Sequence, residues 1–216
     1  MLPTMIDPTA DVHELAIIGQ GTRIWHLAQI REGARLGAGC IIGRGAYVGT
    51  GVEVGDYSKI QNFALVYEPA WLGPGVFIGP AAVLTNDQYP RAVNPDLSQK
   101  SAHDWDPVGV RIEEGAAIGA RAVCVAPVQI GAWSLVAAGS VVINDVPPFA
   151  LVAGVPARRV RWVGHAGVPL DRLEDELWVC PQSGRIYRQI DEDTLVPVTA
   201  EAIQTGIPET APKETP

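Results

Sequence analysis

The chain has 216 residues and a mass of 23.0 kDa, enough for one sizeable domain with a small appendage but too little for two full domains. Apolar residues make up 47% and charged residues 19%, a balance typical of a folded protein with a buried core. The formal net charge is -8. A nucleic acid is therefore not an expected partner, because tracking phosphates needs a basic surface.

The N-terminal segment has no basic stretch followed by an apolar run, so we expect no secretion signal. No stretch approaches the roughly 20 apolar residues that a spanning helix needs, so no membrane partner is expected either. Three widely separated cysteines, Cys40, Cys124 and Cys180, predict a cytoplasmic protein without a disulfide framework. Cys180 has no second cysteine at the spacing of a zinc knuckle, and no metal site is predicted.

The main feature of the sequence is a repeat of six residues. Every sixth residue from Val12 to Leu84 is Ile, Leu or Val, and a mostly small residue follows four positions after each. A period of six matches neither a helix nor one long strand, but it fits a short strand followed by a turn. Because positions four apart face the same way along a strand, both sets are predicted to point into the core of a coil.

The repeat stops after Leu84 and resumes at Ile112, then continues to Val142. The interruption, residues 85–107, is predicted to be a projecting loop, and long loops on rigid scaffolds are usually functional. We predict a first domain over residues 1–163 and a small appendage over 164–216. The appendage is expected to hold a hairpin that turns at Gln182-Ser183-Gly184, followed by a tail, residues 191–216, that is disordered or lies on the surface.

The hexads resemble the hexapeptide repeat of left-handed parallel β-helices, in which three hexads make one triangular turn. Val155-Pro156-Ala157 resembles the closing motif of the acetyl-CoA-dependent acyltransferases with this fold. The segments TRIWHLAQI, KIQNFALVYE and FIGPAAVLTNDQYPR resemble bacterial N-acetyltransferases that act on nucleotide-linked 3-amino sugars. The similarity is greatest to the UDP-2-acetamido-3-amino-2,3-dideoxy-glucuronate N-acetyltransferases of lipopolysaccharide O-antigen biosynthesis.

This resemblance implies an all-β fold, a left-handed parallel β-helix, with acetyl-CoA as co-substrate and no metal. It also implies a homotrimer with active sites between neighbouring subunits and a nucleotide-linked amino sugar as the acceptor.

Residues 18 apart should stack on adjacent coils, about 4.8 Å from each other. This spacing places Glu68 beside Asn86 on one edge and aligns His26, Arg44 and Asn62 on another. The resemblance implies that Asn86 lies beside the reacting amine and that Glu68 and Asp87 line the same pocket, as catalytic residues.

Other residues are candidate contacts for the substrate and the co-substrate. His26 and Asn62 are candidate substrate contacts, and Arg91 is a candidate partner for a carboxylate or phosphate, because guanidinium pairs with either. Arg158 and Arg159 are candidates for the phosphates of CoA, and the resemblance implies that pantetheine lies along Gly119, Ala120 and Ala138. Each of the polar candidates also has a structural alternative as a turn residue, a corner cap or a solvated charge.

The side chain of Asn86 cannot take a proton as a general base, as a histidine would when the acceptor is a hydroxyl. The hypothesis is therefore direct attack by the sugar's 3-amino group on the acetyl thioester, with Asn86 orienting the amine and a backbone N–H stabilising the oxyanion. His103, in the loop, is the rival base.

Three other functions are compatible in part with such a repeat. A zinc carbonic anhydrase with this fold needs three gathered histidines, and the four histidines here include no suitably close pair. A dTDP-linked 3-amino-3,6-dideoxyhexose remains an alternative acceptor, and a non-catalytic binding module remains an alternative role.

Overall fold

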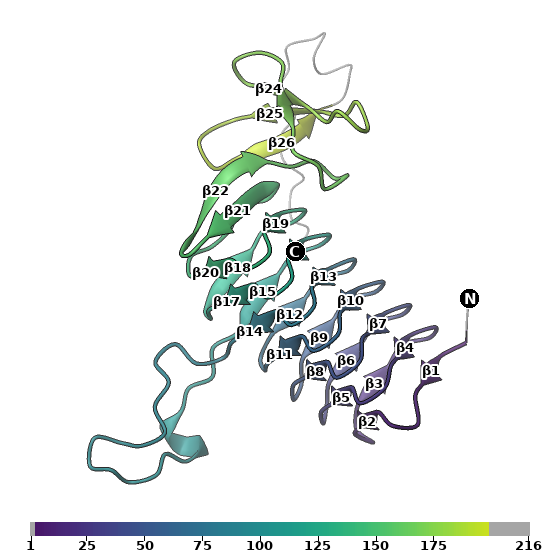
Figure 1. The fold of residues 1–216 in the computed structure, drawn as a ribbon, viewed down its shortest axis with the longest axis vertical. Coiled ribbons are helices and arrows are strands. Elements are labelled where there is room, and N and C mark those ends of the chain that lie inside the picture. Colours follow the sequence, from purple (N-terminus) through teal and green to yellow (C-terminus); the bar gives the residue numbers. More distant parts are fainter. Residues whose placement is uncertain (1–2, 199–216) are drawn as a thin grey trace, which may run out of the picture.

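The computed structural model describes residues 3–198, in which short strands wind into a three-sided parallel solenoid (Figure 1). The first side is a nine-stranded sheet: β1 (Met5–Ile6), β4 (Arg23–Ile24), β7 (Ile41–Ile42), β10 (Lys59–Ile60), β13 (Phe77–Ile78), β16 (Ala117–Ile118), β19 (Leu135–Val136), β21 (Ala150–Gly154) and β22 (Ala157–Trp162). All its neighbours are parallel except β21 and β22, which are antiparallel.

The other two sides are also parallel sheets. The seven-stranded sheet contains β2 (Asp11–Val12), β5 (Gln29–Ile30), β8 (Tyr47–Val48), β11 (Leu65–Val66), β14 (Val83–Leu84), β17 (Val123–Cys124) and β20 (Val141–Val142). The six-stranded sheet contains β3 (Ile17–Ile18), β6 (Arg35–Leu36), β9 (Glu53–Val54), β12 (Trp71–Leu72), β15 (Val110–Ile112) and β18 (Val128–Ile130). We call the turns that follow these sheets corner 1 (nine-stranded), corner 2 (seven-stranded) and corner 3 (six-stranded).

The register between coils is the predicted one. Met5 pairs with Arg23 and Leu65 pairs with Val83, 18 positions apart in each case. The large aliphatic positions form the interior, where Ile24, Ile42 and Ile60 are fully buried. Cys40 and Cys124 are also fully buried, in agreement with their predicted core positions. The prediction of an all-β parallel coil is confirmed, and the architecture is consistent with a left-handed β-helix.

Glycine is required at some of the corners where coils stack, as at Gly37. A Cβ atom on Gly37 would come within 2.6 Å of the backbone nitrogen of Asp56 in the next coil, and it would also collide with the Asp56 carboxylate. Contacts this close do not occur between real atoms, so the coil spacing itself selects glycine at such positions.

The projecting loop leaves the solenoid after β14 and returns at β15 (Figure 1). Phe77 pairs with Ala117, 40 positions away instead of 18, so the loop interrupts one coil without changing the side-chain register. Inside the loop, Val93 and Gln99 form an antiparallel bridge, and the 3-10 helix η1 (Ala102–Asp104) is capped by Ser101. The base is closed by a 3.2 Å hydrogen bond from the Val108 N–H to the Asn86 carbonyl.

The C-terminal part is larger than the predicted hairpin. A four-stranded antiparallel sheet, β23 (Asp171–Arg172), β24 (Leu177–Val179), β25 (Ile186–Gln189) and β26 (Leu195–Val198), lies at the end of the solenoid (Figure 1). The hairpin at residues 182–184 is present between β24 and β25. The tail from residue 191 was predicted to be disordered or to lie on the surface; the part in β26 is ordered and pairs with β25, and residues 199–216 lie outside the described residues. Among residues 3–198, no helix has the length and apolar character to cross a membrane.

Candidate functional site

The loop and corner 2 enclose a cleft of about 400 Å³. Four residues predicted from the sequence line it together: Glu68, Asn86, Asp87 and Arg91. The remaining lining residues are Tyr67, Lys100, Ser101 and Trp105. The floor of the cleft therefore comes from two stacked coils, and its outer wall comes from the loop.

Glu68 differs from the residues at the same position of the two preceding hexads. There, the Asp56 and Asn62 side-chain oxygens accept hydrogen bonds from backbone N–H groups one coil below, at 2.7 and 2.9 Å. The Glu68 side chain packs over Gly49, and its Oε2 atom is buried without a hydrogen-bond partner among the described residues. A buried carboxylate oxygen without a donor is costly, so Glu68 is free to accept a hydrogen bond from a ligand.

Asn86 and Asp87 stand where the chain leaves the solenoid. The Asn86 carbonyl accepts the hydrogen bond from the Val108 N–H that closes the base of the loop. The side-chain amide of Asn86 takes part in none of the hydrogen bonds described for residues 3–198. The Asp87 Oδ1 atom accepts a hydrogen bond from the Tyr89 N–H at 2.9 Å and so shapes the first turn of the loop. The neighbouring Thr85 hydroxyl accepts from the Ala126 N–H at 3.0 Å, which ties the same point to the following coil.

An aromatic pair borders the cleft. The rings of Tyr47 and Tyr67 lie 5.0 Å apart between centroids, and Tyr67 lines the cleft next to Glu68. Burial, with a smaller contribution from the nearby Glu68 carboxylate, raises the pKa of Tyr47. The Tyr47 hydroxyl therefore remains protonated near neutral pH.

Charges of both signs share the cleft without pairing. Glu68 and Asp87 are acidic and Arg91 and Lys100 are basic, and the ion pairs described for residues 3–198 include none of them. The hydrogen bond described for the Arg91 side chain goes to the adjacent Pro90 carbonyl, at 2.8 Å. The arrangement suits a ligand that carries both a hydrogen-bond donor and an anionic group.

The predicted second ladder lies on corner 1, away from this cleft. Along this corner, turn carbonyls accept hydrogen bonds from backbone N–H groups of the next coil, at His26, Arg44, Asn62, Pro80 and Ala120. The donor to Ala120 is Gly139, next to Ala138. His26 Nε2 is 3.2 Å from Asp7 Oδ2, and the Asn62 amide oxygen is bonded to the Arg44 N–H. His26 and Asn62 are therefore joined in one ladder with Gly119, Ala120 and Ala138 and not with Glu68 and Asn86.

The two predicted CoA arginines lie on β22. Arg158 is exposed, and its side chain bonds to the adjacent Ala157 carbonyl at 2.9 Å. Arg159 donates to the Glu192 carbonyl at 2.6 Å and stacks over the Trp162 ring at 4.2 Å. Both line a small cavity of about 210 Å³ with Asn144 and Asp145, and Arg159 also holds the C-terminal sheet. His103 is exposed on η1 and is not among the residues that line the cleft at corner 2.

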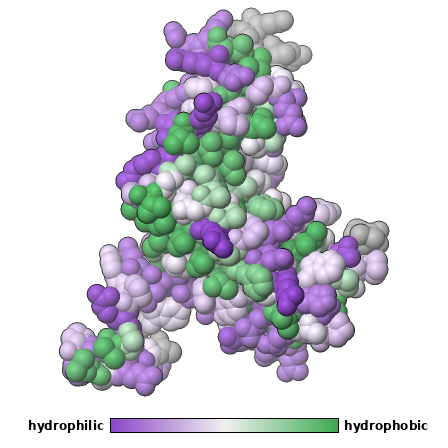
Figure 2. Space-filling view, in the orientation of Figure 1, coloured by the Kyte–Doolittle hydropathy of each residue, from purple (hydrophilic) through white to green (hydrophobic). Residues whose placement is uncertain are grey.

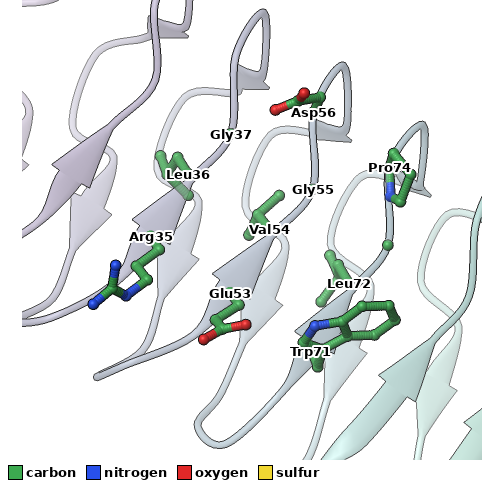
Figure 3. A pocket seen from close by; sticks show the side chains of 11 residues that line it. Arg35, Leu36, Gly37, Glu53, Val54, Gly55, Asp56, Trp71, Leu72 and Pro74 are labelled. Atoms are coloured by element: carbon green, nitrogen blue, oxygen red, sulfur yellow. The ribbon is translucent and has the colours of Figure 1, made fainter. Parts of the chain in front are cut away.

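A second groove, of about 430 Å³, crosses three coils near corner 3 (Figure 3). Figure 3 shows Arg35, Glu53 and Trp71 on one side of this groove and Asp56 and Pro74 on the other. The Trp71 ring also carries the Arg111 guanidinium, 3.7 Å from its centroid. None of the residues predicted as functional lines this groove. Within residues 3–198, no group of three metal-ligating side chains is present.

Sequence reasoning missed Tyr67, Lys100, Ser101 and Trp105. Tyr67 could have been found from its place beside Glu68. The three loop residues lie 14 or more positions after Asn86, and they reach the cleft only because the loop folds back on itself.

Two family models match the solenoid. The family described as "Bacterial transferase hexapeptide (six repeats)" matches residues 15–50, and "Hexapeptide repeat of succinyl-transferase" matches residues 109–143. A solved hexapeptide-repeat containing acetyltransferase from Vibrio cholerae O1 biovar eltor, complexed with acetyl coenzyme A, is 30% identical with a TM-score of 0.48. The alignment covers 61% of this chain and 72% of that chain. The segments that the two models match, residues 15–50 and 109–143, are hexapeptide repeats of the kind found in transferases.

Curated relatives are similar over part of the chain. Serine acetyltransferase of Escherichia coli (strain K12) is 39% identical over 87 residues, 40% of this chain and 31% of that protein. The dTDP-3-amino-3,6-dideoxy-alpha-D-galactopyranose 3-N-acetyltransferase of Aneurinibacillus thermoaerophilus is 40% identical over 80 residues, 37% of this chain and 41% of that protein. The matched part is less than half the length of either relative.

Proposed function

We propose that the protein is an acetyl-CoA-dependent N-acetyltransferase that acylates the 3-amino group of a nucleotide-linked amino sugar. The acceptor is of the UDP-2-acetamido-3-amino-2,3-dideoxy-glucuronate type, used for lipopolysaccharide O-antigen biosynthesis in the cytoplasm. The observation that carries the proposal is the cleft in which Glu68, Asn86, Asp87 and Arg91 meet. The Aneurinibacillus relative, named as a 3-N-acetyltransferase of a nucleotide-linked amino sugar, supports the same reaction class.

In the proposed mechanism, the neutral 3-amino group attacks the thioester carbonyl directly. The Glu68 carboxylate accepts a hydrogen bond from the amine, and the Asn86 side chain fixes the direction of the amine. The C–N bond forms first and gives a tetrahedral oxyanion, which a backbone N–H stabilises; the C–S bond then breaks as the carbonyl re-forms. The amine's proton passes to the departing thiolate, whose conjugate thiol has a pKa of about 8.5, like that of cysteine.

The acetyl donor is assigned to corner 1. Ala120 and Ala138 carry only methyl groups, and a Cβ added at the adjacent Gly139 would meet nothing within 4 Å, so this strip has room for an extended chain. Corner 1 and the cleft at corner 2 lie on different edges of one chain. Donor and acceptor would meet if the cleft of one subunit faces corner 1 of the next, as in the proposed homotrimer.

The loop itself supports this assembly. Figure 2 shows it as a lobe that stands off the solenoid and carries hydrophobic residues toward its outer end. Tyr89 and Leu97 are 75% and 80% exposed. Exposed apolar side chains on a projecting segment are typical of a surface that another subunit covers.

Release of free thiol from acetyl-CoA tests the reaction. UDP- and dTDP-linked 3-amino sugars, each with and without a C6 carboxylate, serve as acceptors, and the matching 3-hydroxy sugars serve as controls. We expect thiol release only with amino sugars and the highest kcat/KM with the UDP-linked uronate. Preference for the dTDP-linked 6-deoxy sugar would favour the alternative acceptor named by the Aneurinibacillus relative. Acylation of the hydroxyl controls would refute the amine assignment, and no release with any acceptor would favour a binding module.

A further inference from the structure

The loop wall of the cleft contains two groups that the proposed mechanism does not use. Lys100 and Trp105 both line the cleft. They come from the loop, whereas Glu68 and Asn86 come from corner 2. The Trp105 Nε1 atom is buried and has no hydrogen-bond partner among the described residues. An indole N–H is a donor only, so this buried group lacks an acceptor.

The hydrogen bonds described within the loop do not use the Lys100 ammonium or the Trp105 indole N–H. The loop's internal hydrogen bonds come from the backbone and from small polar side chains, such as Asn94 to Ser98 at 3.1 Å and Ser101 to Asp104 at 2.8 Å. Lys100 takes part through its backbone N–H, which donates to the Ala92 carbonyl at 3.2 Å. The Lys100 ammonium acts electrostatically on the Asp104 carboxylate, which already accepts hydrogen bonds from Ser101.

The unpaired groups of the cleft thus fall into two sets. Glu68, on the corner, offers a buried acceptor oxygen, while Lys100, Arg91 and Trp105, on the loop, offer donors and positive charge. A ligand that is only an amine would satisfy the corner and leave the loop donors unmatched. A ligand with an amine and an oxyanion would satisfy both sets, and charge-assisted hydrogen bonds to the oxyanion would be the stronger contacts.

We propose that Lys100 and Trp105 are specificity-determining residues that bind an oxyanion group of the acceptor. The cleft then selects an amine that is carried together with a carboxylate or a phosphate group. The inference rests on the proposed function for the amine, but the oxyanion site can be tested without turnover.

The binding test uses two nucleotide sugars without a reactive amine, UDP-glucuronate and UDP-glucose, titrated calorimetrically into the full-length protein. We expect wild type to bind UDP-glucuronate more tightly and Lys100→Met to weaken it by about tenfold, as expected for one charge-assisted hydrogen bond. Lys100→Arg should retain most of the affinity because it keeps the charge. Trp105→Phe, which keeps a ring but removes the N–H, should weaken binding several-fold.

Lys59→Met is the matched control, because Lys59 is an exposed lysine of β10 in the nine-stranded sheet, outside the cleft. Loss of UDP-glucuronate binding alone in Lys100→Met identifies the sugar carboxylate as the bound group. An equal loss for both nucleotide sugars identifies the diphosphate. If neither affinity changes by more than twofold, the oxyanion site is refuted.

Activity separates this inference from the proposed function. With a carboxylated amino sugar, Lys100→Met should raise KM by about tenfold and leave kcat within twofold, because the reacting amine is held on the other side of the cleft. A fall in kcat at unchanged KM would contradict the assignment. If wild type acetylates no amino sugar while Lys100→Met still weakens nucleotide-sugar binding, the proposed reaction fails but the oxyanion site stands.

Discussion

Gly49 lies beneath the Glu68 side chain, and replacing it with alanine should displace the carboxylate without altering its chemistry. A Cβ atom on Gly49 would overlap Glu68 Oε2 and approach the Glu68 backbone nitrogen to 2.7 Å. Gly37 has the same relation to Asp56 at corner 3, with the Asp56 nitrogen at 2.6 Å. Gly37→Ala is therefore a matched control that strains the same kind of coil contact but leaves the cleft untouched.

The stability cost of the two substitutions should be similar. Adding a methyl group to a tightly packed position costs about 1–3 kcal/mol. For a chain of this size that corresponds to a fall in Tm of about 2–12 °C. Activity should separate them, because misplacing a positioning group by about 1 Å costs on the order of 100-fold in rate.

The assay measures thiol release from acetyl-CoA at least 15 °C below the lower of the two melting temperatures, with the amino sugar that wild type uses best. We expect Gly49→Ala to lose about 100-fold in kcat/KM and Gly37→Ala to stay within threefold of wild type. Equal activity of the two folded variants would refute a role for the Glu68 position. Should Gly49→Ala fail to fold, Glu68→Gln removes the negative charge without a backbone clash and tests the same role.

Three further predictions concern the mechanism, the surface and the core. Asn86→Ala should lower kcat by about 100-fold while nucleotide-sugar affinity by calorimetry stays within twofold; equal losses would contradict an orienting role. Hydrogen bonds from Arg31 and the surrounding groups lower the pKa of Glu32 from 4.5 to about 2. Its contribution to stability is therefore present above pH 4.5 and lost as pH falls toward 2, so wild type and Glu32→Gln should converge in urea unfolding at pH 2. Burial raises the pKa of the Cys124 thiol to about 12, so iodoacetamide at pH 8 should label Cys124 only after denaturation, by mass spectrometry.

The hexad pattern was sufficient to predict the solenoid because the coil repeats one local rule. An inward aliphatic residue at every sixth position defines the interior, and pairing 18 positions apart follows from three strands per turn. The same spacing predicted that Glu68 and Asn86 would be neighbours, and both line one cleft. The place of the loop was also predictable, because the repeat stops and resumes in the same inward register.

Other parts depended on contacts between distant segments. The sequence left open whether the tail is disordered or lies on the surface, and Leu195–Val198 is ordered because its backbone pairs with Ile186–Gln189. Arg159 stays a candidate phosphate ligand, and the structure adds that it donates a hydrogen bond to the Glu192 carbonyl of the same tail. Neither contact has a signature in local sequence, since each depends on how the C-terminal sheet packs at the end of the solenoid.

The sequence alone determined the coil, its core and its stacking register, because these follow from periodic local preferences and the backbone pairing that they allow. Only the tertiary structure decided that Lys100 and Trp105 join Glu68 in one cleft, and that the small residues proposed for the donor lie on another corner. The physical reason is that an irregular loop has no period. Its path is set by a few specific hydrogen bonds, such as the one from Val108 to Asn86, and by packing that no local pattern encodes.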